Sequence, residues 1–155
     1  MTQIGTVLSI GDPVMAELAG QALDFAWIDM EHGALSARDA QLLALAVQGT
    51  GAQAYARIPS WRAEALPALL DAGVDGIVVP AIESADEARA IVRRLDYPPA
   101  GIRGYGPRRA GRFGRTDDFA SSPAARPICI LQIESPAGLA AVEAIAATRG
   151  VDAVV

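Results

Sequence analysis

Side chains that can transfer protons or bind ions lie where three apolar runs of the sequence end: Asp29, Glu31 and His32 after the first run, Arg57 in the second, and Gln132 and Glu134 after the third. Imidazole exchanges protons near neutral pH, guanidinium clamps carboxylates through two hydrogen bonds, and carboxylate oxygens bind divalent metals. If the runs are parallel strands, their carboxyl ends meet at one edge of the sheet, where ligands bind. The sequence therefore predicts one site at that edge.

His32 is the only histidine of the chain, and the carboxylates of Asp29 and Glu31 lie within three residues of it. A lone histidine is often a surface residue or a satisfied core group. Its position directly after a buried strand, beside two carboxylates, favours a general base whose basicity a neighbouring carboxylate raises.

Two other residues of the set have two interpretations each. Arg57 either clamps a substrate carboxylate or forms a structural ion pair in the mouth of the fold. Glu134 is either a ligand of a divalent metal or a carboxylate that satisfies the dipole of the helix that follows it.

The composition narrows the chemistry. All 13 basic residues are arginine, so a Schiff base on lysine is excluded, and a carbonyl substrate must be polarised by a metal or by hydrogen-bond donors.

A net charge of -5 and a pI near 4.8 argue against a nucleic-acid binder. No apolar run approaches the roughly 20 residues that span a membrane. Cys129, the single cysteine, is expected to be a buried hydrophobe, and without an internal disulfide the expected location is cytoplasmic.

Short apolar runs alternate with helical patterns, which predicts parallel strands covered by helices. The expected strands are residues 4–10, 25–29, 52–58, 76–80, 127–133 and 151–155, and the expected helices are residues 14–22, 37–49, 62–72, 85–95 and 137–147. The helix boundaries are marked by Asp12-Pro13, by Ser36, by a capping box that begins at Ser84, and by Gly73 after the third helix.

Two α/β architectures compete for this pattern. The length of 155 residues favours an open, doubly wound sheet, because a closed eight-stranded barrel needs about 250 residues. The chemistry-bearing residues at the strand ends favour the barrel. Residues 101–115 are dense in arginine and glycine and are expected to form a long loop, either at the rim of the active site or at a subunit contact.

Residues 24–33 resemble the FDxxxIDxEH signature of a known family, the HpcH/HpaI aldolases. The resemblance continues in chain order through Ala56-Arg57-Ile58-Pro59-Ser60-Trp61, Leu70-Asp71-Ala72-Gly73, Tyr97-Pro98-Pro99-Ala100-Gly101-Ile102-Arg103-Gly104 and Leu131-Gln132-Ile133-Glu134-Ser135. It covers essentially the whole chain.

The resemblance implies a (β/α)8 TIM-barrel domain over residues 1–155, present here as about six βα units without the C-terminal strands. It also implies a class II aldolase that cleaves or forms a carbon–carbon bond beside a pyruvate enolate. The enolate would be held on Mg²⁺, Mn²⁺ or Co²⁺. The substrates would be a 4-hydroxy-2-oxo or 2-keto-3-deoxy acid and an aldehyde, and the full-length protein would be a homo-oligomer.

The resemblance also implies a role for each residue that matches a family motif. His32 would be the base that moves protons through a metal-bound water, and Asp71 would raise the basicity of His32, a role that no local pattern indicates. The remaining roles would be charge stabilisation on the pyruvyl oxygen by Arg57, substrate contact by Gln132, metal ligation by Glu134, and support by Asp29 and Glu31.

One departure from the family pattern affects activity. The family's second metal carboxylate follows the sixth strand, and this chain ends at Val155 inside that strand. We therefore expect the chain to be part of a longer protein and to be weakly active or inactive by itself. Two alternatives are a CoA-ester lyase or citrate-lyase β-like relative, and a non-catalytic module for binding or oligomerisation.

Overall fold

The computed structural model describes residues 2–115, 118–122 and 126–155. Its strands are β1 (Gly5–Leu8), β2 (Phe25–Asp29), β3 (Gln53–Arg57), β4 (Gly76–Val79), β5 (Ile128–Leu131) and β6 (Ala153–Val154). Its α-helices are α1 (Pro13–Ala22), α2 (Ala37–Gly49), α3 (Leu66–Ala72), α4 (Ala85–Leu95), α5 (Pro136–Ala140) and α6 (Val142–Ala146), and two short 3₁₀ turns are η1 (Arg112–Gly114) and η2 (Phe119–Ser121). Strands and helices alternate along the chain, as predicted.

The order of the strands decides between the two architectures. All pairings in the described sheet are parallel, and the strands lie side by side in chain order from β1 to β6. A doubly wound sheet reverses its strand order at a switch point, whereas a barrel adds each strand next to the last. The sequential order therefore gives the (β/α)8-barrel architecture, with six βα units and with β1 and β6 as the outer strands of the described sheet.

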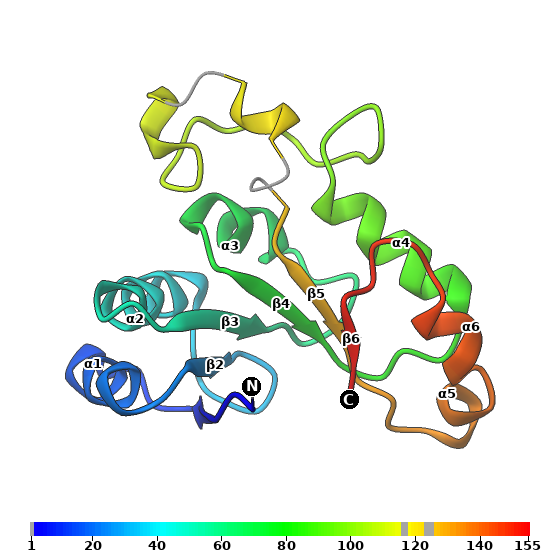
Figure 1. Ribbon diagram of the computed structural model, residues 1–155, viewed down its shortest axis with the longest axis horizontal. Coiled ribbons are helices and arrows are strands. Elements are labelled where there is room, and N and C mark those ends of the chain that lie inside the picture. Colours follow the sequence, from blue (N-terminus) through cyan, green and yellow to red (C-terminus); the bar gives the residue numbers. More distant parts are fainter. Residues whose placement is uncertain (1, 116–117, 123–125) are drawn as a thin grey trace.

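The helices pack on one face of the sheet and form a layer around the curved strands (Figure 1). Between the helices and the sheet lies the main core, which contains fully buried side chains such as Ile28, Leu43, Leu69, Ile77 and Ile91. In the described ranges, no helix has both the length and the apolar content needed to span a membrane.

The opposite face of the sheet is the inner face of the barrel and carries a smaller cluster around Tyr55, Val78 and Ile130. Trp27 packs against it, and Trp27 and Tyr55 are register partners on β2 and β3. Because side chains alternate between faces, the residue two positions after Trp27 also lies on the inner face. That residue is Asp29, at the carboxyl end of β2.

Several predicted element boundaries differ from the structure. The third helix begins at Leu66 instead of residue 62, because Pro67 is tolerated only in a first turn. The fifth helix is divided at Ala141, whose φ of -102° and ψ of 2° leave the helical range. β2 has the predicted bounds, whereas the other strands are shorter than predicted, and β6 has only two residues.

The predicted helix caps are confirmed, with one change. The Ser36 hydroxyl accepts from the Asp39 amide, and the Asp39 carboxylate accepts from the Ser36 amide, which completes a capping box. At Ser84 only the first half forms, because the Glu87 carboxylate accepts from the amide of Glu83, one residue earlier than a capping box requires. Gly73 ends α3 in the left-handed region, with φ of 74°, as a glycine C-cap does.

Candidate active site

An ion pair between β2 and β3 forms the centre of the candidate site. Asp29 and Arg57 are register partners at the carboxyl ends of the two strands. Arg57 Nε donates to Asp29 Oδ1 at 3.0 Å, and Arg57 Nη2 donates to Asp29 Oδ2 at 2.7 Å. The side chain of Asp29 is only 5% exposed and that of Arg57 only 15%. This two-point contact fixes the plane of the guanidinium.

Asp29 also shapes the turn that follows β2. Its Oδ1 accepts from the backbone amides of Glu31 at 3.1 Å and His32 at 3.2 Å. A Cβ at Gly33 would collide with the carbonyl oxygen of Asp29, so only glycine fits this turn. The turn therefore presents Glu31 and His32 at the carboxyl edge, which is the edge of the sheet where the strands end.

Asp29 and Arg57 each stabilise the charged form of the other. Burial alone would raise the pKa of Asp29. The hydrogen bonds from the Arg57 side chain and from the amides of His32 and Glu31 outweigh it, and the pKa lies below the ordinary value of 3.8. The hydrogen bond to Asp29 raises the pKa of Arg57, against the effect of its burial, and the charges of Asp29, Glu31 and Glu134 raise it further. Arg57 is therefore a permanent cation at this edge.

Glu31 lies between the ion pair and the histidine. Its Oε2 is 3.4 Å from Arg57 Nε and 3.7 Å from His32 Nε2. The glutamate side chain is 18% exposed, whereas that of His32 is 73% exposed and lies open to a solute. The structure thus brings Asp29, Glu31, His32 and Arg57 together, as the sequence predicts.

Gln132 and Glu134 follow β5 at the same edge. The backbone amide of Gln132 donates to the carbonyl of Val79, the last residue of β4. Glu134 Oε2 accepts from the backbone amide of Ala81 at 2.9 Å, so the two residues are tied to the end of β4 and to the segment that follows it. Ala81 has a φ of 52°, in the left-handed region, where a non-glycine residue is strained. Gln132 Oε1 is buried and has no hydrogen-bond partner in the described part of the chain.

The side-chain oxygens of Gln132 and Glu134 are of the kind that binds a divalent cation, but they are too few to hold one. Glu134 is exposed and has a second carboxylate oxygen, Oε1, besides the one bound to Ala81, and Gln132 Oε1 lacks a donor nearby. Oxygen ligands of this type suit Mg²⁺ and Mn²⁺. No cluster of three or more histidine, cysteine, aspartate or glutamate side chains that could hold a metal occurs among the described residues. The described residues therefore do not form a complete metal site by themselves.

Asp71 does not join the other predicted residues within this chain. It lies in the last turn of α3, just before β4 begins, at the amino edge where the strands start. Its backbone oxygen accepts from the Ala110 amide at 3.1 Å. Its carboxylate faces Gly106, where a Cβ would lie 2.7 Å from Asp71 Oδ2. His32 is at the opposite edge, so the carboxylate beside His32 in this chain is Glu31.

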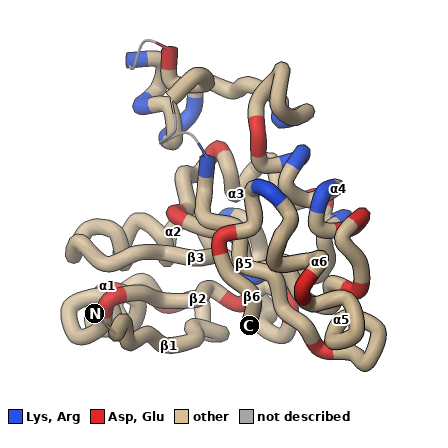
Figure 2. Tube along the Cα trace, turned by 45° about the vertical axis from the view of Figure 1, so that its right-hand side comes forward, with Lys and Arg blue, Asp and Glu red and all other residues tan. Residues whose placement is uncertain are grey.

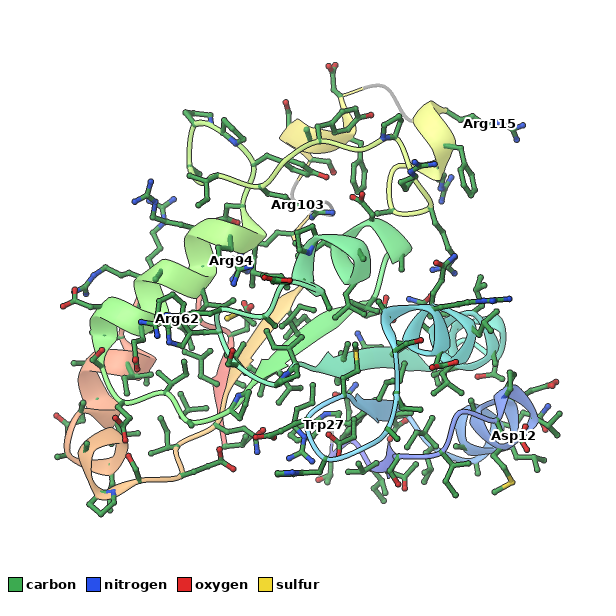
Figure 3. The ribbon with its side chains drawn as sticks, turned by 180° about the vertical axis from the view of Figure 1, so that it is seen from behind. Asp12, Trp27, Arg62, Arg94, Arg103 and Arg115 are labelled. Carbon is green, nitrogen blue, oxygen red and sulfur yellow. The ribbon has the colours of Figure 1, made fainter. Side chains whose placement is uncertain are left out.

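The arginine-rich segment, residues 101–115, also lies at the amino edge and does not form a rim around the candidate site of its own chain. Its second predicted role, a subunit contact, stays a prediction. Arg109 Nη1 donates to the Gln48 side chain and to the carbonyl of Ala72 at the end of α3. Figure 2 shows the basic positions of this segment above the helices, and in Figure 3 Arg115 lies at its outer end. The physical reason is topological, because a segment that follows a helix and precedes a strand returns to the edge where strands begin.

The two large cavities of the described structure, about 880 and 1170 Å³, also lie at the amino edge. The first is lined by the arginine-rich segment and the second by α4, α6 and Arg126. Neither includes a predicted site residue. Both cavities are therefore separate from the candidate site.

Sequence reasoning missed two participants in the site. The Trp27 side chain lies below Asp29 on the inner face, and its buried Nε1 has no hydrogen-bond partner among the described residues. Ala81 contributes only its backbone amide. Strand alternation, which places residues 27 and 29 on one face, could have identified Trp27, but no sequence signal marks Ala81.

The sequence model of the family described as "HpcH/HpaI aldolase/citrate lyase" matches residues 6–155. The chain belongs to this family. The HpcH/HpaI relatives include a 4-hydroxy-2-oxovalerate aldolase of Rhodococcus jostii, 38% identical over 99% of this chain and 60% of that protein. They also include a hydroxypyruvate/pyruvate aldolase of Paraburkholderia phytofirmans, 42% identical over 96% of this chain and 60% of that protein.

The fold comparison agrees with the family assignment. An HpcH/HpaI aldolase/citrate lyase family protein of Burkholderia cenocepacia superimposes with a TM-score of 0.92 and 34% identity, over 98% of this chain and 62% of that one. The chain thus spans about three fifths of the length of the HpcH/HpaI relatives it matches. The predicted family and the predicted barrel fold are confirmed.

Proposed function

We propose that this chain carries the oxo-acid-binding and proton-transfer part of an aldolase site, in a carbon–carbon lyase that acts beside a pyruvate enolate. The observation that supports this most is the cluster of Asp29, Arg57, Glu31 and His32 at the carboxyl edge. It places a fixed cation next to an exposed imidazole. The names of the relatives, which are aldolases of 2-oxo acids, agree with this chemistry.

Arg57 is the proposed donor to the oxo acid. Its Nε and Nη2 are held by Asp29, and within the described residues its Nη1 makes no hydrogen bond. The guanidinium can therefore donate to the pyruvyl oxygen without reorienting. Donors that are already oriented toward developing negative charge stabilise an enolate more than its keto precursor.

His32 is the proposed base, and Gln132 is a proposed substrate contact. An exposed imidazole can approach a methyl or hydroxyl proton of the bound acid and take it near neutral pH. Gln132 Oε1, buried without a donor, can accept a hydrogen bond from a substrate hydroxyl. Asp29 holds Arg57 in place, and Glu31 lies beside both Arg57 and His32.

Glu134 is the proposed contribution of this chain to a divalent-metal site for Mg²⁺, Mn²⁺ or Co²⁺. When bound, such an ion would act as a Lewis acid on the oxo group, in place of the lysine Schiff base that a chain without lysine cannot form. The other ligands must come from water, from the substrate or from residues outside this chain.

The proposed function is tested by hydrogen–deuterium exchange at the pyruvate methyl group, with and without Mn²⁺, in wild type and His32→Ala. We expect metal-dependent exchange that falls by about 10²-fold or more in His32→Ala, as loss of a general base does. Glu64→Ala, which removes an exposed glutamate after β3, is the matched control and should keep the wild-type rate. Wild-type exchange no faster than buffer would contradict the proposal and favour a non-catalytic module.

The metal contribution is tested by binding alone. Calorimetric titration with Mn²⁺ should give a weak site in wild type that is lost in Glu134→Gln and retained in Glu143→Gln, which changes an exposed glutamate on α6. Equal binding in all three proteins would show that Glu134 is not a ligand and would leave the helix-dipole interpretation of this residue.

A further inference from the structure

Three aspartates make the same pair of hydrogen bonds at the amino edge of the sheet. Each lies one position before an even-numbered strand, and each binds both backbone groups of one residue at the start of the strand before it. The pairs are Asp24 with Ile4, Asp75 with Ala54, and Asp152 with Cys129. In every pair the aspartate amide donates to the partner's carbonyl at 2.9 Å. The aspartate carboxylate accepts from the partner's amide, at 2.8, 2.8 and 2.7 Å in chain order.

The sequence around these aspartates repeats with every second strand. Residues 73–79 read GVDGIVV, and residues 150–155 read GVDAVV. Both segments begin with a glycine of positive φ, 74° at Gly73 and 97° at Gly150, which turns the chain from a helix into the strand. The odd-numbered strands β3 and β5 follow Ala52 and Pro127 instead, and these residues carry no carboxylate.

Each of these contacts fixes the relative position of two strands. A buried backbone N–H needs an acceptor, and an ionised carboxylate gives a shorter and stronger hydrogen bond than a carbonyl does. Because one residue is held through both its N–H and its C=O, a shift of the strands by one position would break both hydrogen bonds. We call each of the three contacts an amino-edge clamp.

The junctions between the clamped pairs are joined differently at the same edge. The amide of Gln53, at the start of β3, donates to the backbone carbonyl of Asp24 at 3.0 Å. The amide of Ile128, at the start of β5, donates to the backbone carbonyl of Asp75 at 2.9 Å. These are ordinary neutral hydrogen bonds, so the amino ends are held less firmly at β2/β3 and β4/β5 than within the clamped pairs.

Side-chain contacts cross the same two junctions at the carboxyl edge. Arg57 binds Asp29 across β2/β3, and Glu134 accepts from the Ala81 amide across β4/β5. The residues of the candidate site thus join strands that lack an amino-edge clamp.

We propose that the sheet is built from two-strand units, β1–β2, β3–β4 and β5–β6, and that its amino edge opens between these units before it opens within one. The proposal does not depend on the proposed function. A unit closed by a clamp moves as one body, so any adjustment of the candidate site takes place where two units meet, and the register inside each unit is kept.

Hydrogen exchange of neighbouring amides tests this proposal. Gln53 and Ala54 are adjacent, but the first amide crosses a junction and the second belongs to a clamp, and the same holds for Ile128 and Cys129. After correction for intrinsic rates, we expect Gln53 and Ile128 to exchange about tenfold faster than Ala54 and Cys129 in wild type. Nuclear magnetic resonance gives the rate of each amide separately.

Variants of one clamp make the result specific. In Asp75→Ala the Ala54 amide should exchange at least about tenfold faster, whereas Cys129, which belongs to another clamp, should change less than about twofold. Asp75→Asn keeps a side-chain oxygen that can accept and should restore most of the protection of Ala54. Leu43→Ala is the control for global destabilisation, because it removes a fully buried core side chain and should speed Ala54 and Cys129 alike.

Two results would overturn the proposal. One is equal protection of the adjacent amides in wild type. The other is an Asp75→Ala variant that speeds Ala54 and Cys129 by the same factor, as Leu43→Ala does, since the aspartate would then support only the fold as a whole. If Asp75→Ala does not fold, the wild-type comparison of adjacent amides decides by itself.

Discussion

Asp29 and Arg57 occupy facing positions at the ends of β2 and β3 and hold each other through hydrogen bonds of 3.0 and 2.7 Å. This contact is the structural ion pair that was one of the two interpretations of Arg57. Because it holds the guanidinium by two hydrogen bonds, it also fixes the plane of the group that the proposed function assigns to the oxo acid.

Removal of Arg57 should destabilise the fold. Arg57→Leu leaves Asp29 buried with two backbone amides as its only donors, and losing one partner of a buried pair costs about 3–5 kcal/mol. Urea denaturation should show this decrease in the free energy of unfolding. Arg89→Leu is the matched control, because it breaks an exposed pair with Asp86 that is worth about 0–1 kcal/mol. Equal losses in the two variants would contradict a special role for the buried pair.

The ion pair should also make stability depend on pH in acid. The pKa of Asp29 is lowered in the folded state, so its stabilising effect is complete above the unfolded value near 3.8 and is lost as pH falls through the folded pKa. The difference in unfolding free energy between wild type and Asp29→Asn should be constant from pH 7 to about 5. It should shrink as the pH falls below 4, as measured by urea denaturation. A difference that grows in acid would mean the opposite shift.

Gln132 should be required for ligand binding but not for stability. Its buried Oε1 has no hydrogen-bond partner in the described residues, so Gln132→Leu removes an unsatisfied group. We expect the free energy of unfolding to change by less than about 1 kcal/mol or to increase. The affinity for a 4-hydroxy-2-oxo acid, whose hydroxyl can donate to Gln132 Oε1, should fall about tenfold when measured by calorimetry in the presence of Mn²⁺. A loss of stability above that range would indicate a structural hydrogen bond instead.

Cys129 should be unreactive in the native protein. It is buried, as predicted, and burial raises the pKa of its thiol to about 12. Because the thiolate is the reactive species, a disulfide reagent at pH 8 should modify the native chain far more slowly than the urea-unfolded chain. As this is the only thiol, the absorbance change reports one site. Rapid modification of native protein would show that β5 opens readily.

Much of the fold followed from local patterns. Apolar runs such as residues 76–79 are buried on both faces, which is why they indicate parallel strands under helices. Ser36 and Gly73 act through their own backbone neighbours, so their positions were predictable. The start of α3 was mispredicted although the signal was present, since Pro67 must lie in the first turn of a helix.

The sequence by itself determined the family, the strand-end residues and the exclusion of lysine chemistry, because these depend on residue identity and short spacings. It did not determine which carboxylate faces His32. Only the tertiary structure placed Glu31 at 3.7 Å from the imidazole and put Asp71 and the arginine-rich segment at the opposite edge. The physical reason is that each helix reverses the chain direction. A residue at the end of a helix therefore lies at the amino edge, about the length of a strand away from the carboxyl ends of its neighbours.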